Sequence, residues 1–133
     1  MPAQRDEIAK YIKKKYKADP EALWAKTPNC VIFRHADNRK WFALIMDIER
    51  DRLGFDSPEV VDILNVKITD MMLKDALLQQ RGYLPAYHMS KTHWITILLD
   101  GSVSMDTICG LIDESFGATA TVVKRRVKRK RID

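Results

Sequence analysis

Two apolar runs joined by four polar residues constrain the fold of this chain more than any other part of its sequence. Residues 30–35 (CVIFRH) and 40–48 (KWFALIMDI) are rich in β-branched and aromatic side chains. The intervening ADNR contains Asp37 and Asn38, which favour turns. This pattern predicts a β-hairpin. Both faces of the second run are largely apolar, which indicates a central strand covered on both sides, although a short buried helix would have a similar pattern.

Three further runs have the character of strands. Residues 60–68 (VVDILNVKI) are apolar and β-branched, and residues 93–100 (HWITILLD) alternate so that one face carries Ile95, Ile97 and Leu99. Residues 83–89 (YLPAYHM) form a shorter run that contains Pro85. Because proline cannot donate a hydrogen bond to a neighbouring strand, this run is predicted to lie at an edge or at the start of a strand.

Helical periodicity precedes the hairpin. Near the N-terminus an apolar stripe at helical spacing is flanked by lysines, and it consists of Ile8, Tyr11, Ile12 and Tyr16. Asp19 is suited to cap a second helix and Pro20 to begin it, so we expect a short helix that carries Leu23 and Trp24 and stops before Pro28.

Two more helices are expected in the second half of the chain. One begins at Thr69 or Asp70 and ends with Gly82 as its C-terminal cap, and the other begins at Ser104 and ends at Gly117. Strands in hairpins and helices in separate segments predict an α+β fold. We expect an antiparallel sheet of about five strands, packed by N-terminal, middle and C-terminal helices.

The net charge of +5 comes from one end of the chain. Seven of the 23 basic residues and one of the 18 acidic residues lie in the last ten positions, KRRVKRKRID. Residues 1–123 therefore carry 16 basic and 17 acidic residues, a net charge of −1. A chain of 133 residues is long enough for one domain with a core. We predict a single α+β domain over residues 1–120 and a basic C-terminal tail over residues 121–133.

The composition also bears on location and on cysteine chemistry. No run approaches the roughly 20 apolar residues that cross a bilayer, and the N-terminus lacks an apolar leader, so we expect a cytoplasmic protein without a membrane partner. Cys30 and Cys109 lie far apart and neither belongs to a CxxC motif, which favours reduced, buried thiols over a disulfide or a metal knuckle.

Four segments together resemble the MmcQ/YjbR family of small bacterial proteins. They are FRHADNRKWFALIMDI, VDILNVK, GYLPAYHMSKTHWITILLDGSVSMD and LIDESF, and the resemblance extends from about Trp24 to Phe116. Its most specific mark is Lys-x-His-Trp at the start of a strand, followed by Leu-Asp-Gly. The resemblance implies a CyaY-like, "double wing" fold and a DNA-binding label. Phe116 departs from the family pattern, in which a tyrosine is expected.

Nucleic-acid binding could rest on two sets of residues. The first is the basic tail, which would neutralise phosphates without reading sequence and could equally be a solvated terminus; it contains Lys124, Arg125, Arg126, Lys128, Arg129, Lys130 and Arg131. The second is a folded surface that requires the hairpin and the start of the last strand to lie side by side; it would contain Arg34, Arg39, Lys40, Lys91, His93 and Trp94. Tryptophans in strands are more often core residues than contacts with bases.

Other chemistries have weaker support in the sequence. A pocket or an active site could use His88, Ser90, Lys91 and His93, but no nucleophile elbow or phosphate-binding glycine loop accompanies them. Three separate histidines, His35, His88 and His93, lack the helical spacing of a zinc site, so we expect no metal and no cofactor.

The leading hypothesis is therefore a small non-enzymatic protein, monomeric by default, that binds DNA through phosphate contacts. The alternative is a module that binds a small ligand or a partner protein, or an unrecognised enzyme, through a pocket around the four residues from His88 to His93.

Overall fold

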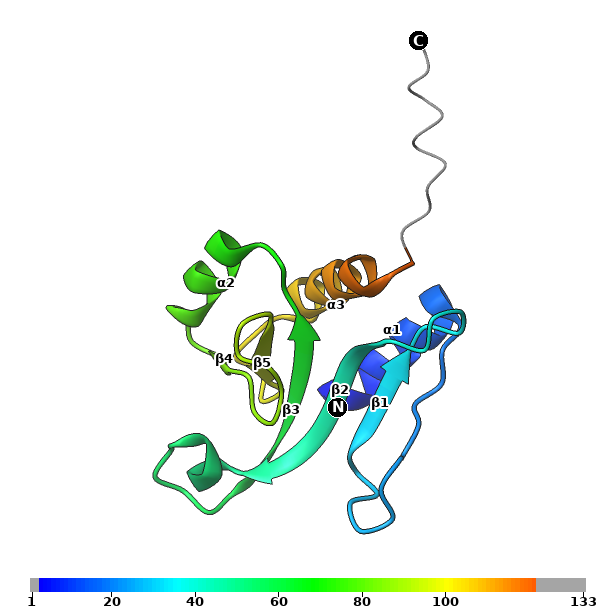
Figure 1. The fold of residues 1–133 in the computed structure, drawn as a ribbon. Helices are drawn as coiled ribbons and strands as arrows, with labels where there is room; N and C mark the ends of the chain where they lie inside the picture. The colour runs from blue at the N-terminus through cyan, green and yellow to red at the C-terminus, as the bar shows by residue number, and fades with distance from the viewer. Residues whose placement is uncertain (1–2, 122–133) are drawn as a thin grey trace.

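The computed structural model describes residues 3–121 and has an α+β architecture. Five strands form one antiparallel sheet in the order β1-β2-β3-β5-β4 (Figure 1). The elements in chain order are α1 (Gln4–Tyr16), β1 (Val31–Arg34), β2 (Trp41–Glu49), the short 3-10 helix η1 (Arg50–Leu53), β3 (Val60–Lys67), α2 (Met71–Leu78), β4 (Tyr83–Pro85), β5 (Trp94–Leu98) and α3 (Met105–Thr119). The predicted fold class is confirmed.

The predicted hairpin is formed by β1 and β2. Val31 pairs with Ile45, and the register shifts between Phe33 and Arg34, where a bulge precedes the turn. On its other side β2 pairs with β3, so β2 is an internal strand as its apolar sequence indicated. Its residues 42–45 are buried. The proline-containing strand β4 lies at an edge of the sheet, also as predicted.

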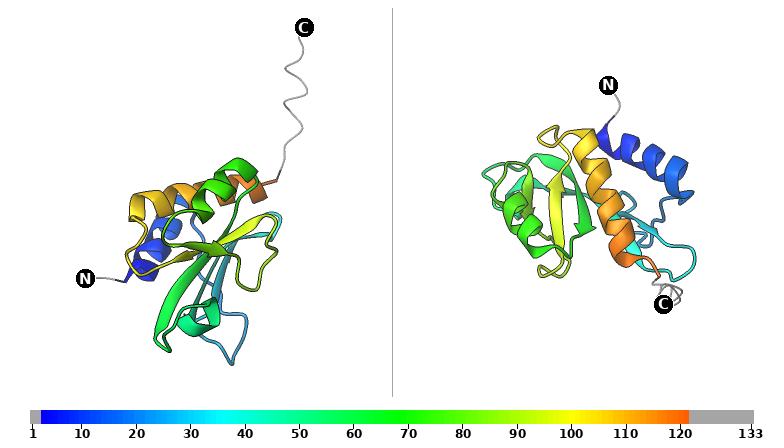
Figure 2. Two further views of the ribbon diagram at one scale, coloured as in Figure 1. Left: turned by 90° about the vertical axis from the view of Figure 1, so that its left-hand side faces the viewer. Right: turned by 90° about the horizontal axis from the view of Figure 1, so that it is seen from above.

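Helices cover one face of the sheet and complete the main core (Figure 2). Helix α1 contributes Ile8 and Ile12, and α3 contributes Ile108 and Ile112, all four with no exposed surface. They pack against the side chains that β2, β3 and β5 direct towards this face: Ala43, Ile45, Leu64, Val66, Ile95 and Ile97. Because side chains alternate along a strand, every second residue of these strands faces the helices.

Side-chain caps begin two of the helices as the sequence predicted. The Asp70 carboxylate accepts a hydrogen bond from the Leu73 amide at 3.1 Å, and the Ser104 hydroxyl accepts one from the Thr107 amide at 3.2 Å. Both bonds satisfy amides that have no partner within the first turn of a helix.

The prediction of a short helix after Asp19 is wrong. Glu21 and Ile32 instead exchange two backbone hydrogen bonds of 2.9 Å, so this segment runs extended along the free edge of β1. Pairing with an exposed strand edge satisfies the backbone of this segment outside a helix. We call residues 18–30, which connect α1 to β1, the strap; it leaves Leu23 and Trp24 more than two-fifths exposed.

The sequence predicted that Gly82 and Gly117 end helices, and both predictions are wrong. Helix α2 already ends at Leu78, and Gly82 lies directly before β4 with a φ of 98°. A Cβ atom at Gly82 would approach Val103 to 2.6 Å, so this position requires glycine for close packing as well as for its backbone angle. Gly117 lies inside α3, which continues to Thr119.

The second face of the sheet is covered by connecting segments. It carries two smaller apolar clusters, one around Ile32 and Leu44 and the other around Ile63 and Leu98. Residues 86–93 connect β4 to β5, and we call them the β4–β5 loop. Side chains from the strap and from this loop lie over this face. The sheet therefore has one face sealed by helices and one face closed by loops.

Candidate functional site

The β1–β2 turn presents two exposed basic side chains, Arg39 and Lys40. Arg39 has a left-handed backbone with φ of 64°. Arg34 differs from them because its guanidinium makes two hydrogen bonds to the carboxylate of Glu21, at 3.0 and 2.5 Å. This pair fixes the strap to β1 and engages Arg34 on the protein itself.

The end of the described chain is fastened to this turn. Thr121 donates a hydrogen bond from its hydroxyl to Asp37 at 2.9 Å, and the Asn38 side-chain amide donates to the Thr119 carbonyl at 2.9 Å. His35 contacts the Thr119 hydroxyl at 2.8 Å beneath the turn. Position 121 therefore lies at the β1–β2 turn, where Asp37 and Asn38 hold it. The predicted tail residues, Lys124 to Arg131, lie outside the described residues.

Burial lowers the pKa of His35, which is only 6% exposed and packs against the ring of Phe116 at 4.2 Å between ring centroids. Burial of this ring therefore favours its neutral form. Phe116, the departure from the family pattern, also stacks on Tyr16 at 3.7 Å. Its ring thus has a packing role between α3, α1 and the hairpin turn.

The other predicted nucleic-acid contacts lie at the same end of the sheet but not beside the hairpin. Lys91 and His93 are exposed, and Trp94 is half-buried at the start of β5. β3 separates β5 from β2, so three strand spacings, roughly 14 Å, separate β1 from β5. The structure places these residues and the hairpin turn in two neighbouring groups.

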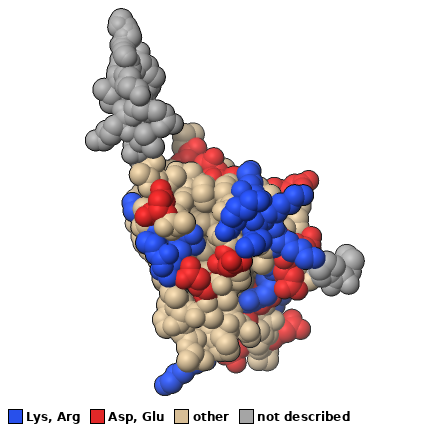
Figure 3. Space-filling view, turned by 90° about the vertical axis from the view of Figure 1, so that its right-hand side faces the viewer, with Lys and Arg blue, Asp and Glu red and all other residues tan. Residues whose placement is uncertain are grey.

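One face of the molecule carries both basic and acidic residues. The face in Figure 3 carries Lys and Arg in separate groups with Asp and Glu among them. The exposed basic residues of the fold include the lysines of α1, namely Lys10, Lys13, Lys14 and Lys15. This mixed surface agrees with the net charge of −1 that the sequence assigns to residues 1–123.

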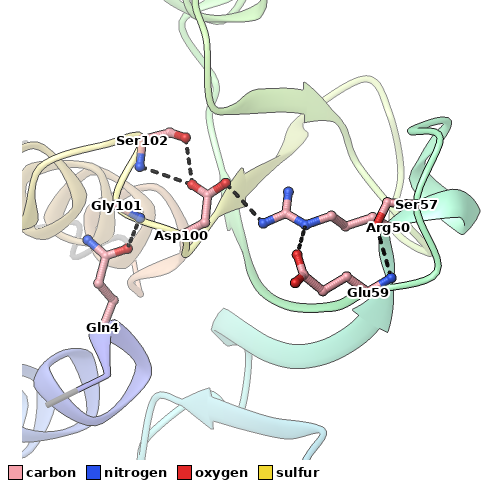
Figure 4. Close-up of polar contacts among 7 residues, drawn as sticks. All are labelled: Gln4, Arg50, Ser57, Glu59, Asp100, Gly101 and Ser102. Carbon is pink, nitrogen blue, oxygen red and sulfur yellow. Dashed lines mark hydrogen bonds and ion pairs between the residues drawn. The ribbon is translucent and has the colours of Figure 1, made fainter.

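The Leu-Asp-Gly part of the family motif forms a turn (Figure 4). One carboxylate oxygen of Asp100 accepts hydrogen bonds from the amide and hydroxyl of Ser102 at 3.0 and 2.6 Å. The other pairs with Arg50 at 3.3 Å, and the Gly101 amide donates to Gln4 of α1 at 3.1 Å. Burial alone would raise the pKa of Asp100, but the hydrogen bonds from Ser102 and Arg50 lower it. The motif therefore ties β5 to η1 and α1.

A cavity of about 510 Å³ lies on the loop-covered face of the sheet. Leu44 and Met46 of β2 line it from the sheet, and the strap and the β4–β5 loop contribute to its walls. The lining side chains are mostly apolar or aromatic and include Trp24, Cys30, Trp41, Tyr87, His88 and Met89, with Asp47 also among them. This aromatic cavity, as we call it, has the size and lining of a small-molecule site.

Two buried polar side chains hold the β4–β5 loop over the sheet. Asn65 and Thr96 have no exposed surface, and the Thr96 hydroxyl donates to the Asn65 side-chain oxygen. Asn65 then donates to the Tyr87 carbonyl at 3.0 Å, and the Tyr87 amide donates to Thr96 at 2.9 Å. His88 follows with a left-handed φ of 61°, a conformation uncommon for a side-chain-bearing residue.

Of the four residues considered for a pocket, only His88 lines the aromatic cavity. Ser90, Lys91 and His93 are exposed and are not among its lining residues. The sequence analysis did not identify Trp24, Asp47 or Tyr87 as site residues. Trp24 could have been recognised from the sequence, because it is a large aromatic residue within a polar connecting segment. The prediction of a helix over this segment placed Trp24 in the wrong environment.

The cysteines, the potential metal ligands and the helices further limit the kinds of site that residues 3–121 can form. Cys30 is buried and Cys109 is partly buried, and burial raises the pKa of both free thiols. Within residues 3–121 no three His, Cys, Asp or Glu side chains are grouped as metal ligands. Over the same residues no helix combines the length and apolar character needed to span a membrane.

The fold and the site together define a small α+β domain with helices on one face of its sheet and a loop-enclosed aromatic cavity on the other. The family model described as YjbR matches residues 5–118, and the chain belongs to this family. The predicted family resemblance is confirmed.

Relatives cover nearly the whole described chain. "Uncharacterized protein YyaQ" of Bacillus subtilis is 40% identical over 115 residues, which are 86% of this chain and 97% of that protein. A crystal structure of a protein from Pseudomonas syringae is also 40% identical, with a TM-score of 0.83 over 87% of this chain and 98% of that one. A Deinococcus radiodurans protein, 19% identical with a TM-score of 0.60 over 98% of this chain and 83% of that one, shares the fold.

Proposed function

We propose that this protein binds nucleic acid, DNA in the first instance, through phosphate contacts made by the basic tail together with the β1–β2 turn. The observation that carries the proposal is the attachment of Thr121 to Asp37 and of Thr119 to Asn38. These bonds start the tail at the turn that exposes Arg39 and Lys40. Seven basic residues follow within the next ten positions of the sequence.

The mixed charge of the folded surface favours a contact centred on the β1–β2 turn and the start of the tail. A phosphate backbone attracts clustered cations, and each neutralised phosphate releases counterions. The hairpin turn and the tail can act on neighbouring phosphates, whereas Arg34 is engaged by Glu21. Binding of this kind is indifferent to base sequence, because phosphate contacts position a protein without reading bases. Lys91, His93 and Trp94 would extend the same contact across the end of the sheet.

Fluorescence anisotropy with a labelled duplex, titrated over a series of salt concentrations, tests the proposal. The full chain is compared with a chain that ends at Val123. Removing the tail should weaken binding at low salt and flatten the dependence of affinity on salt by about 0.9 for each phosphate that is no longer neutralised. If the full chain fails to bind duplex and single-stranded DNA at low salt, the proposal is wrong.

A pair of double variants with equal charge change tests the role of the turn. Arg39→Gln with Lys40→Gln should reduce affinity, and Lys26→Gln with Arg81→Gln, which removes two exposed cations elsewhere, should reduce it much less. Equal losses from both pairs would mean that overall charge, and not this corner, governs binding. Scrambled duplexes of equal length should bind alike, since the contacts are to phosphates.

A further inference from the structure

We propose that the aromatic cavity binds a small neutral molecule that contains an aromatic ring. This inference is independent of nucleic-acid binding, since none of the predicted nucleic-acid contacts among the described residues lines the cavity. It rests on the direction of the strand side chains, on the uncharged lining, and on the bonds that hold the two covering segments over the sheet.

Alternation along β2 decides which of its side chains face the cavity. Leu44 and Met46 belong to the apolar clusters of the loop-covered face, and Ile48 packs there as well. Asp47 lies between Met46 and Ile48 in the strand, so its side chain points to the opposite, helix-covered face. There it accepts a hydrogen bond from the side-chain amide of Asn29 at 3.0 Å. Strand β2 therefore directs only apolar side chains into the cavity.

The remaining lining adds no charge with which a ligand could pair deep in the cavity. Among the described residues no Lys, Arg or Glu borders it, and the strap contributes Trp24, Thr27 and Cys30. Burial raises the pKa of the Cys30 thiol, so this thiol is uncharged at pH 7. His88 is an exposed residue, so water screens its charge when the ring is protonated. An ionised ligand would therefore lose hydration without gaining an opposite charge, which favours a neutral one.

The rings and thioethers of the lining favour an aromatic ligand over an aliphatic one. The lining includes Trp24, Trp41 and Tyr87 together with Met46 and Met89. Trp24 and Trp41 meet edge to face, 6.0 Å apart between ring centroids and at 83°. A ligand ring can extend this set of ring contacts, and a thioether sulfur makes favourable contacts with a ring. The cavity volume of about 510 Å³ lies within the roughly 300–1,000 Å³ of small-molecule sites.

The two covering segments are held over the sheet by bonds that need no ligand. The buried side chains of Asn65 and Thr96 bond to the backbone of Tyr87, whose side chain lines the cavity. On the opposite side, the backbone of Glu21 pairs with that of Ile32 in β1 and holds the strap. The walls are therefore in place before a ligand arrives, which reduces the entropy lost on binding.

Titration with naphthalene derivatives of similar size and different charge tests this inference. The probes are 1-naphthylmethanol, 1-naphthylmethylammonium and 1-naphthoate, and calorimetry reports their binding to the full chain. The neutral alcohol should bind, and each ion should bind at least about tenfold more weakly because it gives up hydration. Equal affinity for the alcohol and either ion, or no binding of the alcohol up to its solubility limit, would overturn the inference.

The saturated analogue decahydro-1-naphthylmethanol tests the requirement for an aromatic ring. It keeps the neutral alcohol and an apolar body, but it lacks ring contacts with the tryptophans and the thioethers. It should bind several-fold more weakly than 1-naphthylmethanol. Equal affinity for the two alcohols would contradict an aromatic ligand.

The indole N–H signals of the tryptophans locate the bound probe. Trp24 and Trp41 line the cavity, and Trp94 does not. In NMR spectra of the full chain, the signals of Trp24 and Trp41 should move when 1-naphthylmethanol is added, and the signal of Trp94 should stay. A change confined to Trp94, or binding without any change at Trp24 and Trp41, would place the ligand outside the cavity and overturn the inference.

Two neighbouring residues of the strap offer a matched pair of variants. Leu23 and Trp24 are 42% and 43% exposed, and of the two only Trp24 lines the cavity. Trp24→Ala removes an aromatic wall and should weaken binding of 1-naphthylmethanol by about tenfold. Leu23→Ala should bind it as the unaltered chain does. Equal affinities of the two variants would contradict the proposed site.

Thermal melting of each variant, without and with 1-naphthylmethanol, checks that the fold is kept. The alcohol should raise the melting temperature of the unaltered chain and of Leu23→Ala, and raise that of Trp24→Ala less. If it raised all three melting temperatures equally, the ligand would not contact Trp24 and the inference would be wrong.

Discussion

The two faces of the sheet are built from equally apolar strands and yet are covered in different ways. On one face Ile8, Ile12, Ile108 and Ile112 approach from helices and leave no exposed surface. On the other face Leu44 and Met46 line a cavity of about 510 Å³ beneath two irregular segments. Helices present a continuous stripe that fills a groove, whereas loops touch a sheet at a few pinned positions. The helix face is closed by tight packing, whereas the loop face keeps a cavity between the sheet and its covering segments.

Matched leucine truncations on the two faces provide the largest test of this comparison. Leu64→Ala on the helix face should reduce the free energy of unfolding by about 3 to 4 kcal/mol, because it leaves a closed void in a packed core. Leu44→Ala on the loop face should cost about 1 to 2 kcal/mol less, since that side chain already borders a cavity. Urea denaturation of both variants measures the difference, and equal losses would contradict it.

Removing the buried amide beneath the β4–β5 loop should have the next largest effect. Asn65→Ala leaves the Tyr87 carbonyl and the Thr96 hydroxyl without their partner and should cost about 2 kcal/mol. Hydrogen exchange should quicken in residues 86–90 more than in α3. Asn38→Ala, which removes an amide from the partly exposed hairpin turn, is the comparison. If the two variants exchanged alike in the β4–β5 loop, Asn65 would not be its anchor.

The contact between α1 and α3 gives the helix face a dependence on acid. Asp113 accepts hydrogen bonds from Tyr11, Lys15 and Tyr16. Burial alone would raise the pKa of Asp113, but these hydrogen bonds lower it, and burial together with the bond to Asp113 raises the pKa of Tyr16 to about 12. A lowered carboxylate pKa stabilises the fold above the ordinary value of 3.8, and this stabilisation is lost as the pH falls below it.

Asp113→Asn should accordingly cost about 1 kcal/mol at neutral pH. Its difference from the unaltered chain should shrink as the carboxylate of the latter becomes protonated. Urea midpoints measured from pH 7 to pH 3 test this expectation. A difference that stayed constant over that range would show that the charge of Asp113 does not contribute to the contact.

The smallest predicted effect concerns His35, which lies beneath the β1–β2 turn. Burial lowers the pKa of His35 below its usual 6.5, so the unfolded chain binds a proton more readily than the folded one. Its neutral form stabilises the fold fully above pH 6.5, and this contribution decreases as the pH falls through that value towards the lowered pKa. NMR shifts of Thr119 and Asn38 should follow His35 protonation as the pH is lowered from 7.5 until the ring is protonated, and shifts that do not change with that protonation would contradict this coupling.

Much of the fold could be predicted because the signals were local. The apolar runs of β2 and β5, the caps at Asp70 and Ser104, and the edge position of Pro85 all depend on residues close in sequence. The strap could not be predicted in the same way. Asp19 and Pro20 have the local chemistry of a helix start, but pairing of Glu21 with Ile32 satisfies the same backbone through a distant partner.

The candidate sites show the same difference between features that neighbouring residues determine and features that distant residues determine. By itself the sequence determined the α+β class, the family and the concentration of positive charge in the last ten residues, because periodicity, motif and composition are properties of neighbouring residues. Only the tertiary structure decided that Thr121 returns to the hairpin turn, that Arg34 is engaged by Glu21, and that Trp24, Asp47 and Tyr87 line one cavity. These depend on contacts between residues far apart in the chain, which arise only when the strands and loops pack together.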